Sequence, residues 1–160
     1  MSGTGNSYRA AVWMKELAQK KDIKSELAQM IRCLGNSNAG EDKNDLLGMV
    51  FPTHGFTAPW HVIRYALSLP RGKGKHAFVA ATRAGTRIAS IPFPGLEGTA
   101  AYLIALILFI KGYKICGVTG LDMPSNWMSL HWGLHLRNSQ YIIHRARPKA
   151  EVFISRIIDG

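Results

Sequence analysis

Short apolar runs alternate with helical segments along this chain, and that alternation restricts the fold more than any other feature. Three runs, 45–51, 76–81 and 113–119, have the length and composition of strands that are covered on both faces. Segments 59–69 and 96–110 lie between them and have helical character. Strands that alternate with helices are joined by right-handed crossovers into a parallel sheet. The sequence therefore predicts a doubly wound α/β fold with helices on both faces of the sheet.

The remaining segments extend this pattern toward both ends of the chain. A helix is predicted from Tyr8 to Lys20, followed by a short strand from Ala28 to Leu34. A final helix is predicted within Leu134 to Ile158, and Pro148 is a candidate break point because proline lacks the amide N–H. No internal repeat or linker divides the 160 residues, so we expect a single domain over residues 1–160.

Basic residues outnumber acidic ones, with 20 Lys and Arg against 10 Asp and Glu and a net charge of +10. They are spread along the chain without the interleaved aromatic residues of a nucleic-acid track, so nucleic-acid binding is an alternative that rests on charge alone. A basic surface suits acidic partners, and a merely solvated surface is the other interpretation.

The chain has no segment that predicts membrane contact or export. Its longest apolar run, 100–110, has 11 residues, which is too short to cross a bilayer and suits a buried helix. Its first residues lack the charged, apolar and small-residue regions of a signal peptide. We therefore expect a cytoplasmic protein.

The cysteines and histidines predict no metal site. Cys33 and Cys116 lie far apart within apolar stretches, which predicts reduced thiols in the core, and two cysteines cannot hold an iron–sulfur cluster. His131 and His135 are four residues apart and would share a helix face, but no nearby Cys, Asp or Glu completes a ligand set. A packing or surface role is predicted for both histidines. Asp122 is predicted to be a turn residue rather than a catalytic acid or base.

The loop Ser2-Gly3-Thr4-Gly5-Asn6-Ser7 near the start of the chain has the chemistry of a phosphate site. Its glycines let a ligand approach the backbone, and the helix that follows offers N–H groups and the positive end of its dipole. The chain has no Gly-Lys-Ser/Thr tripeptide, which excludes a P-loop. Tyr8 stands where a dinucleotide-binding loop needs a small residue. A helix with an ordinary N-terminal cap is the structural alternative.

Three motifs together resemble one known family. Ser2 to Ser7 resembles the Thr/Ser-x-Thr-Gly-x-Thr/Ser loop with which flavodoxins bind the phosphate of FMN. Phe51 to Gly55, FPTHG, and Lys111 to Trp127, which contains a Gly-Tyr pair, a strand and a Met-Pro-x-Asn motif, follow in the expected order. The chain thus resembles the flavodoxin-like domain of bacterial flavodoxin/ferredoxin fusion proteins, the EFR-type family.

This resemblance implies a flavodoxin-like fold and FMN as the cofactor. The glycine loop would hold the phosphate of FMN, the loops after strands 45–51 and 76–81 would border the two sides of the isoalloxazine ring, and the Met-Pro-x-Asn motif would lie near the flavin edge. The cofactor-binding residues that it implies are Ser2, Gly3, Thr4, Gly5, Asn6, Ser7, Pro52, Thr53, His54, Gly55, Thr82, Arg83, Ala84, Gly85, Pro124 and Asn126.

A flat ring also needs a stacking face, and His54, Phe56 and Trp60 are the candidates. His54 is the best placed of the histidines because it lies in a loop at the carboxyl end of a strand. Taken alone, Trp60 is predicted to be a core residue at the start of its helix, whereas the place of Phe56 is left open.

Two departures from the family shape the functional prediction. Flavodoxins have a central strand before the phosphate loop, and it is missing here. We expect the natural chain to start upstream of Met1; the alternatives are that strand 28–34 closes the gap or that another segment fills it in trans. The ferredoxin half is missing too, so electrons would pass to a separate acidic redox protein such as a ferredoxin.

The sequence therefore predicts an FMN-binding electron-transfer flavoprotein. An NAD(P)H-dependent FMN or quinone reductase is the alternative, in which Arg83 or Arg87 would bind the phosphates of the nicotinamide cofactor. A truncated product that does not bind FMN is a further alternative, and a homo-oligomer is left open.

Overall fold

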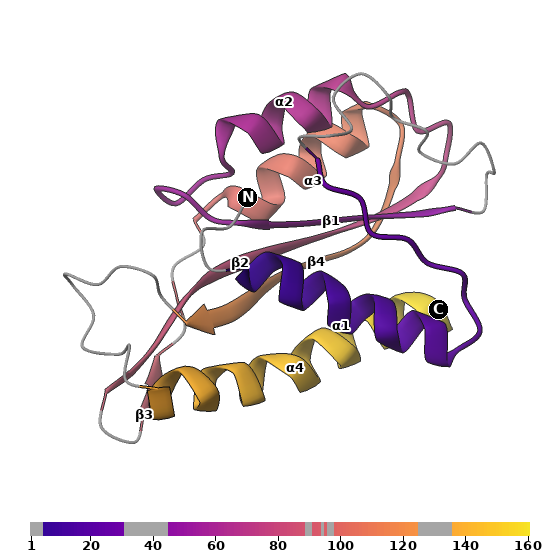
Figure 1. Cartoon of the computed structure of the whole chain (residues 1–160). Coiled ribbons are helices and arrows are strands. Elements are labelled where there is room, and N and C mark those ends of the chain that lie inside the picture. The colour runs from indigo at the N-terminus through magenta and orange to yellow at the C-terminus, as the bar shows by residue number, and fades with distance from the viewer. Residues whose placement is uncertain (1–4, 31–44, 89–90, 94, 96–97, 125–135) are drawn as a thin grey trace.

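In the described part of the chain, a small parallel sheet has two helices on each face (Figure 1). The computed structural model describes residues 5–30, 45–88, 91–93, 95, 98–124 and 136–160. The strands are β1 (Leu46–Pro52), β2 (His76–Ile88), β3 (Ile91–Phe93) and β4 (Lys114–Pro124). The helices are α1 (Asn6–Lys20), α2 (Trp60–Ser68), α3 (Ala100–Ile110) and α4 (Leu136–Asp159). β2 is central: β1 and β4 pair with it in parallel, and β3 folds back against its end in antiparallel orientation.

The alternation of side chains along the strands separates two cores. In β2, Val79 belongs to the core beneath α2 and α3, and its neighbour Phe78 belongs to the core beneath α1 and α4. Phe51 of β1 lies in the first core and Met123 of β4 in the second. Successive side chains of a strand point to opposite faces, so these strands must be apolar on both sides. The predicted doubly wound α/β fold is confirmed, and the arrangement is compatible with a flavodoxin-like fold, although the sheet is small.

Two strands are longer than the sequence predicts. β2 continues to Ile88 and β4 to Pro124, so residues 82–86 form part of a strand and not the predicted loop. Their extended form comes from pairing, because residues 82–85 of β2 lie in register with residues 121–124 of β4. The prediction of a loop from Thr82 to Gly85 was wrong for this reason.

The predicted strand from Ala28 to Leu34 is not present in the part of it that the structure describes. Residues 23–29 have no regular secondary structure, and 31–34 lie outside the described residues. Met30 is instead partly buried against the core beneath α2 and α3. The segment after α1 thus crosses from the α1–α4 side to the other face of the sheet (Figure 1). Among the described strands, β1 pairs only with β2.

Two smaller predictions were also wrong. α4 is continuous through Pro148. Pro148 is exposed, and the helix tolerates it at the cost of one backbone hydrogen bond, because proline has no amide N–H. Cys116 is an exposed free thiol and not a core residue, because it lies near the start of β4 at an outer position of the sheet. Cys33 lies outside the described residues, and none of the described helices is both long and apolar enough to span a membrane.

The packing of α3 on the sheet predicts unequal effects of two substitutions on one helix. Ile104 is fully buried, whereas Leu106 is 54% exposed. We expect Ile104→Ala to lower the free energy of unfolding by about 2–5 kcal/mol through lost contacts and a residual cavity. Leu106→Ala should change it by less than about 0.5 kcal/mol. Urea unfolding of both variants measures this difference, and equal destabilisation would contradict the described packing of α3.

Candidate functional site

The first turn of α1 lies at the carboxyl edge of the sheet. Gly5 precedes the helix in a left-handed conformation, with φ 71°, that favours glycine. A Cβ on Gly5 would meet no atom within 4 Å, so the requirement is conformational and the backbone there faces open space. Within the described residues, no side chain caps this end of the helix. The first N–H groups of a helix have no acceptor within the helix, so this end presents donors and positive potential.

Two side chains of α1 fasten this end to the sheet. The Ser7 and Thr82 hydroxyls form a hydrogen bond of 2.7 Å, and both residues are buried. Thr82 Oγ1 also lies 3.5 Å from the carbonyl oxygen of Phe51. Asn6 Nδ2 donates to the carbonyl oxygen of Pro124 at 2.9 Å. Ser7 and Asn6, predicted to contact phosphate, thus place the helix end through their side chains, while their backbone N–H groups lie in its first turn.

The loop after β1 is tied to the neighbouring strand and to α3. The Thr53 N–H donates to the Thr82 carbonyl oxygen at 2.9 Å, which continues the pairing of Pro52 with Thr82. His54 and Thr57 bond each other's backbone, and between them Gly55 and Phe56 both have positive φ, 56° and 64°. That conformation is uncommon for a residue other than glycine.

The start of α3 holds this turn in place. The N–H of Thr99 donates to the carbonyl oxygen of Phe56 at 2.9 Å. Gly98 approaches so closely that a Cβ there would lie 2.1 Å from the same oxygen. The far side of the turn is open, since a Cβ on Gly55 would meet nothing within 4 Å. The turn therefore has a fixed inner side and an accessible outer side.

Two aromatic side chains are exposed near this turn. Phe56 is 62% exposed, and Trp60, predicted to be a core residue, is 67% exposed. Trp60 begins α2, whose buried face contains Val62 and Ala66 instead. His54 is exposed as well. Burial lowers the pKa of His61, one residue after Trp60, and His54 acts in the same direction through charge repulsion. The neutral imidazole of His61 is thus favoured.

An ion pair joins the neighbouring strands β2 and β4. Arg83 Nε donates to Asp122 Oδ1 at 2.8 Å, and the backbone N–H of Gly95 donates to the same oxygen at 2.8 Å. Lys149 Nζ of α4 lies 3.6 Å from Oδ2. Asp122 is therefore a strand residue with several partners and not the predicted turn residue. Gly85 leaves it room, since a Cβ at Gly85 would lie 2.9 Å from Asp122 Cβ.

The structure brings most of the described site residues to this one edge. Pro52 ends β1, Ala84 lies in β2 between Arg83 and Gly85, and Pro124 ends β4. Ser2, Gly3, Thr4 and Asn126 lie outside the described residues, as do His131 and His135. In the described part of the chain, no three His, Cys, Asp or Glu side chains are grouped so that they could hold a metal ion.

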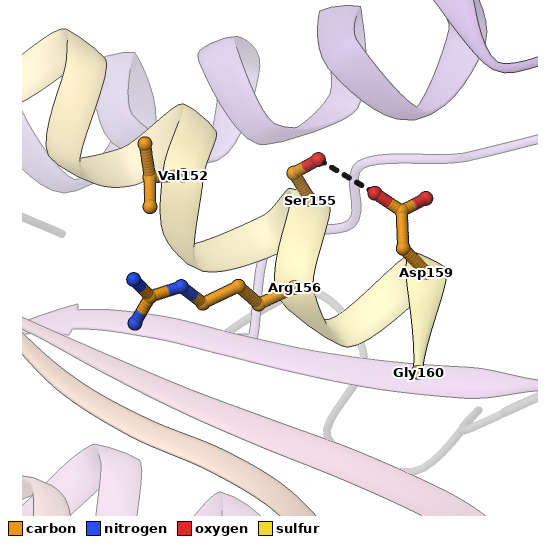
Figure 2. A pocket seen from close by; sticks show the side chains of 5 residues that line it. All are labelled: Val152, Ser155, Arg156, Asp159 and Gly160. Atoms are coloured by element: carbon orange, nitrogen blue, oxygen red, sulfur yellow. Dashed lines mark hydrogen bonds between the residues drawn. The ribbon is translucent and has the colours of Figure 1, made fainter.

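A separate hollow lies along the last turns of α4 (Figure 2). Its lining residues are Val152, Ser155, Arg156, Asp159 and Gly160, and none of them was predicted as a site residue. Ser155 Oγ donates to Asp159 Oδ2 at 2.9 Å, and Lys21 Nζ donates to Ser155 Oγ and to both Asp159 oxygens. The hydrogen bond from Lys21 holds the pKa of Asp159 below its usual value. The polar groups of this hollow bond one another and join the end of α1 to α4, which is a structural role. The candidate site is therefore the carboxyl edge of the sheet.

Comparison with known proteins does not assign this chain to a family. No model of a known protein family matches it, and no match is found among curated proteins or among solved structures. Function is therefore argued from the residues at the carboxyl edge.

The buried bond between Ser7 and Thr82 predicts coupled mutational effects. Thr82→Val removes the partner of the buried Ser7 hydroxyl, and Ser7→Ala leaves the Thr82 hydroxyl only its 3.5 Å contact with the Phe51 carbonyl oxygen. Each variant should therefore lower the free energy of unfolding by about 1–3 kcal/mol. The double variant should lose at least about 0.5 kcal/mol less than the sum of the two, because the bond is lost only once. Urea unfolding of the four proteins measures this coupling.

Ser68→Ala supplies the matched control for this cycle. The Ser68 hydroxyl bonds only within α2, to the carbonyl oxygen of Tyr65 at 2.8 Å in the described contacts. Its effect should add to that of Thr82→Val. Additive effects of Ser7→Ala and Thr82→Val would show that the two hydroxyls do not interact.

Proposed function

We propose that this chain is an electron-transfer flavoprotein that binds FMN noncovalently at the carboxyl edge of its sheet. The observation that carries the proposal is the position of the start of α1. Among the described residues no side chain caps this helix end, and Asn6 and Ser7 fasten it beside the end of β4 and Thr82 of β2. A helix end of this kind binds phosphate through its N–H groups and its dipole.

The groups around this edge fit the two chemical parts of FMN. The backbones at Gly5 and Gly55 both face open space, which a ligand needs in order to approach the main chain. The turn from His54 to Thr57 offers backbone groups for the polar edge of a ring, and the exposed Phe56 beside it supplies an apolar stacking surface. Phosphate at α1 and the ring beside this turn is the arrangement that we propose.

FMN, when bound, supplies the redox chemistry through its isoalloxazine ring, and the protein supplies binding, orientation and electrostatics. The net charge of +10 would guide an acidic redox protein, such as a ferredoxin, toward the flavin. The alternative reductase function receives no support from Arg83, whose guanidinium is engaged with Asp122. We propose electron exchange with a separate partner in the cytoplasm.

The role of the phosphate can be tested with two ligands that share one ring. FMN and riboflavin differ by the phosphate, so a site built on the start of α1 should bind FMN at least tenfold more tightly, a difference of about 1.4 kcal/mol. Titration of each flavin with the protein, followed by quenching of flavin fluorescence, gives both Kd values. Equal Kd values for the two flavins would contradict the proposal, and so would a failure of FMN to bind.

A pair of glycine variants provides the control for this titration. Gly5→Ala strains the backbone beside α1 and places a methyl group in the open space, so it should weaken FMN binding severalfold or more. Gly74 also has a positive φ, 87°, and only one atom within 4 Å of a Cβ, but it lies in the segment between α2 and β2. Gly74→Ala should leave FMN affinity unchanged. Equal losses in both variants would indicate general destabilisation.

A further inference from the structure

Helix α3 has an apolar stripe on its outer side. Ile104 and Leu108 are fully buried against the sheet. The opposite side of the helix carries Tyr102, Leu106, Phe109 and Ile110, which are 54–73% exposed. Their spacing is that of neighbours along one side of a helix. A helix that is apolar all round is normally buried, so the outer side of α3 has the composition of a covered surface.

Helix α2 extends this surface. It covers the same face of the sheet as α3 (Figure 1), and its Leu67 is 54% exposed. Lys111, at the end of α3, donates through Nζ to the carbonyl oxygen of Leu67 at 2.8 Å, which places the two helix ends side by side. We call the exposed set Leu67, Tyr102, Leu106, Phe109 and Ile110 the α2–α3 surface. Apolar residues gathered in this way mark interaction sites.

The described residues of the helices and turns that form the α2–α3 surface carry charge of one sign. Segments 53–75 and 98–113, which contain both helices and their flanking turns, include five Lys and Arg residues and no Asp or Glu. Arg64 is exposed on α2 one turn before Leu67, and Lys111 directly follows Ile110. A partner that covers the apolar stripe therefore gains from carboxylates at its margins.

Charge also bears on the kind of partner. A second copy docked through the same surface would bring cations such as Arg64 and Lys111 of both copies to one interface, with no carboxylate from segments 53–75 and 98–113 to offset them, and like charges at an interface are unfavourable. A lipid surface could take up the apolar residues while Arg64 reaches its headgroups, so it is the competing occupant that vesicle binding tests. A protein helix with an apolar stripe and flanking carboxylates satisfies both the stripe and the cations.

We propose that the α2–α3 surface binds an acidic amphipathic helix of a partner protein. The apolar side of that helix packs against α3, and its Asp or Glu side chains lie near Arg64 and Lys111. This proposal concerns partner recognition and does not rest on the flavin site, since it uses none of the residues assigned to FMN.

A displayed library of 18-residue helical peptides provides the test. The peptides keep an apolar stripe, and their remaining positions are randomised among Asp, Glu, Lys, Gln and Ser. Selection on the full chain, with counter-selection on Phe109→Glu, should enrich sequences of net negative charge. Enrichment of neutral or basic sequences would overturn the proposal. A failure of any peptide to bind the full chain better than it binds Phe109→Glu would overturn it too.

Measured affinities of the most enriched peptide then test the residues. Phe109→Glu and Arg64→Glu should each raise its Kd at least tenfold. Val152→Glu and Arg156→Glu make the same changes of charge on exposed positions of α4 and should leave the Kd within twofold. Equal losses in the α4 variants would show nonspecific attraction and overturn the proposal.

Binding of a second copy of the chain and binding to a membrane are measured with the same proteins. Sedimentation equilibrium should show no self-association that Phe109→Glu abolishes, and vesicles of phosphatidylcholine with one quarter phosphatidylserine should not bind in a way that depends on Phe109. Self-association that Phe109→Glu abolishes would assign the surface to a second copy, and vesicle binding that depends on Phe109 would assign it to a membrane. Each of these results would overturn the proposal. FMN affinity should be unchanged in Phe109→Glu, so failure of this proposal and failure of the flavin site are distinguishable.

Discussion

The buried hydrogen bond between Ser7 and Thr82 fixes where α1 begins, and the candidate site is arranged around that point. The bond joins residues that are 75 positions apart in the chain. Loss of the Thr82 hydroxyl removes the partner of the buried Ser7 hydroxyl, and loss of the Ser7 hydroxyl leaves Thr82 only its long contact with the Phe51 carbonyl oxygen, which is costly in a low-dielectric interior. Together with the bond from Asn6 to Pro124, it holds the positive end of the helix dipole beside Thr82 of β2 and the end of β4. The N–H groups of the first turn are thereby oriented in advance, so a bound anion would not have to order them.

Much of this fold could be predicted from the sequence because buried parallel strands are apolar on both sides. The runs 45–51 and 113–119 show this pattern directly, and the structure places β1 and β4 over them. The ends of β2 and β4 could not be found in the same way. Residues 82–85 contain a threonine, an arginine and a glycine, and their extended form depends on register with β4 and on the ion pair between Arg83 and Asp122. Such pairing is set by the tertiary structure and not by local composition.

The candidate site shows the same limit. The glycine loop predicted an anion-binding helix end, and the described part of the chain has an uncapped helix that starts after Gly5. The partners of Asn6 and Ser7 were not predicted, because neither bond has a local sequence signal. The exposure of Trp60 did have such a signal. Val62 and Ala66 of α2, with Leu69 directly after it, define a buried face, and helical spacing places Trp60 and Leu67 on the opposite side.

Two regions of the molecule thus differ in what they offer to other molecules. The carboxyl edge presents helix-end N–H groups and an open turn, which suit a phosphorylated ring. The outer side of α2 and α3 presents apolar side chains with cations, which suit a protein helix. In the two proposals, a cofactor at one edge and a partner on a neighbouring face would use separate residues.

The central claim is that the start of α1 binds the phosphate of FMN. Amide chemical shifts of the 15N-labelled protein test it most directly, because they report on each backbone N–H during an FMN titration. The account predicts that the amides of Asn6, Ser7 and Tyr8 shift together with that of Gly55, while those of Ser155 and Asp159 stay in place. Shifts confined to the hollow along the end of α4, or unchanged amides at the start of α1, would contradict it.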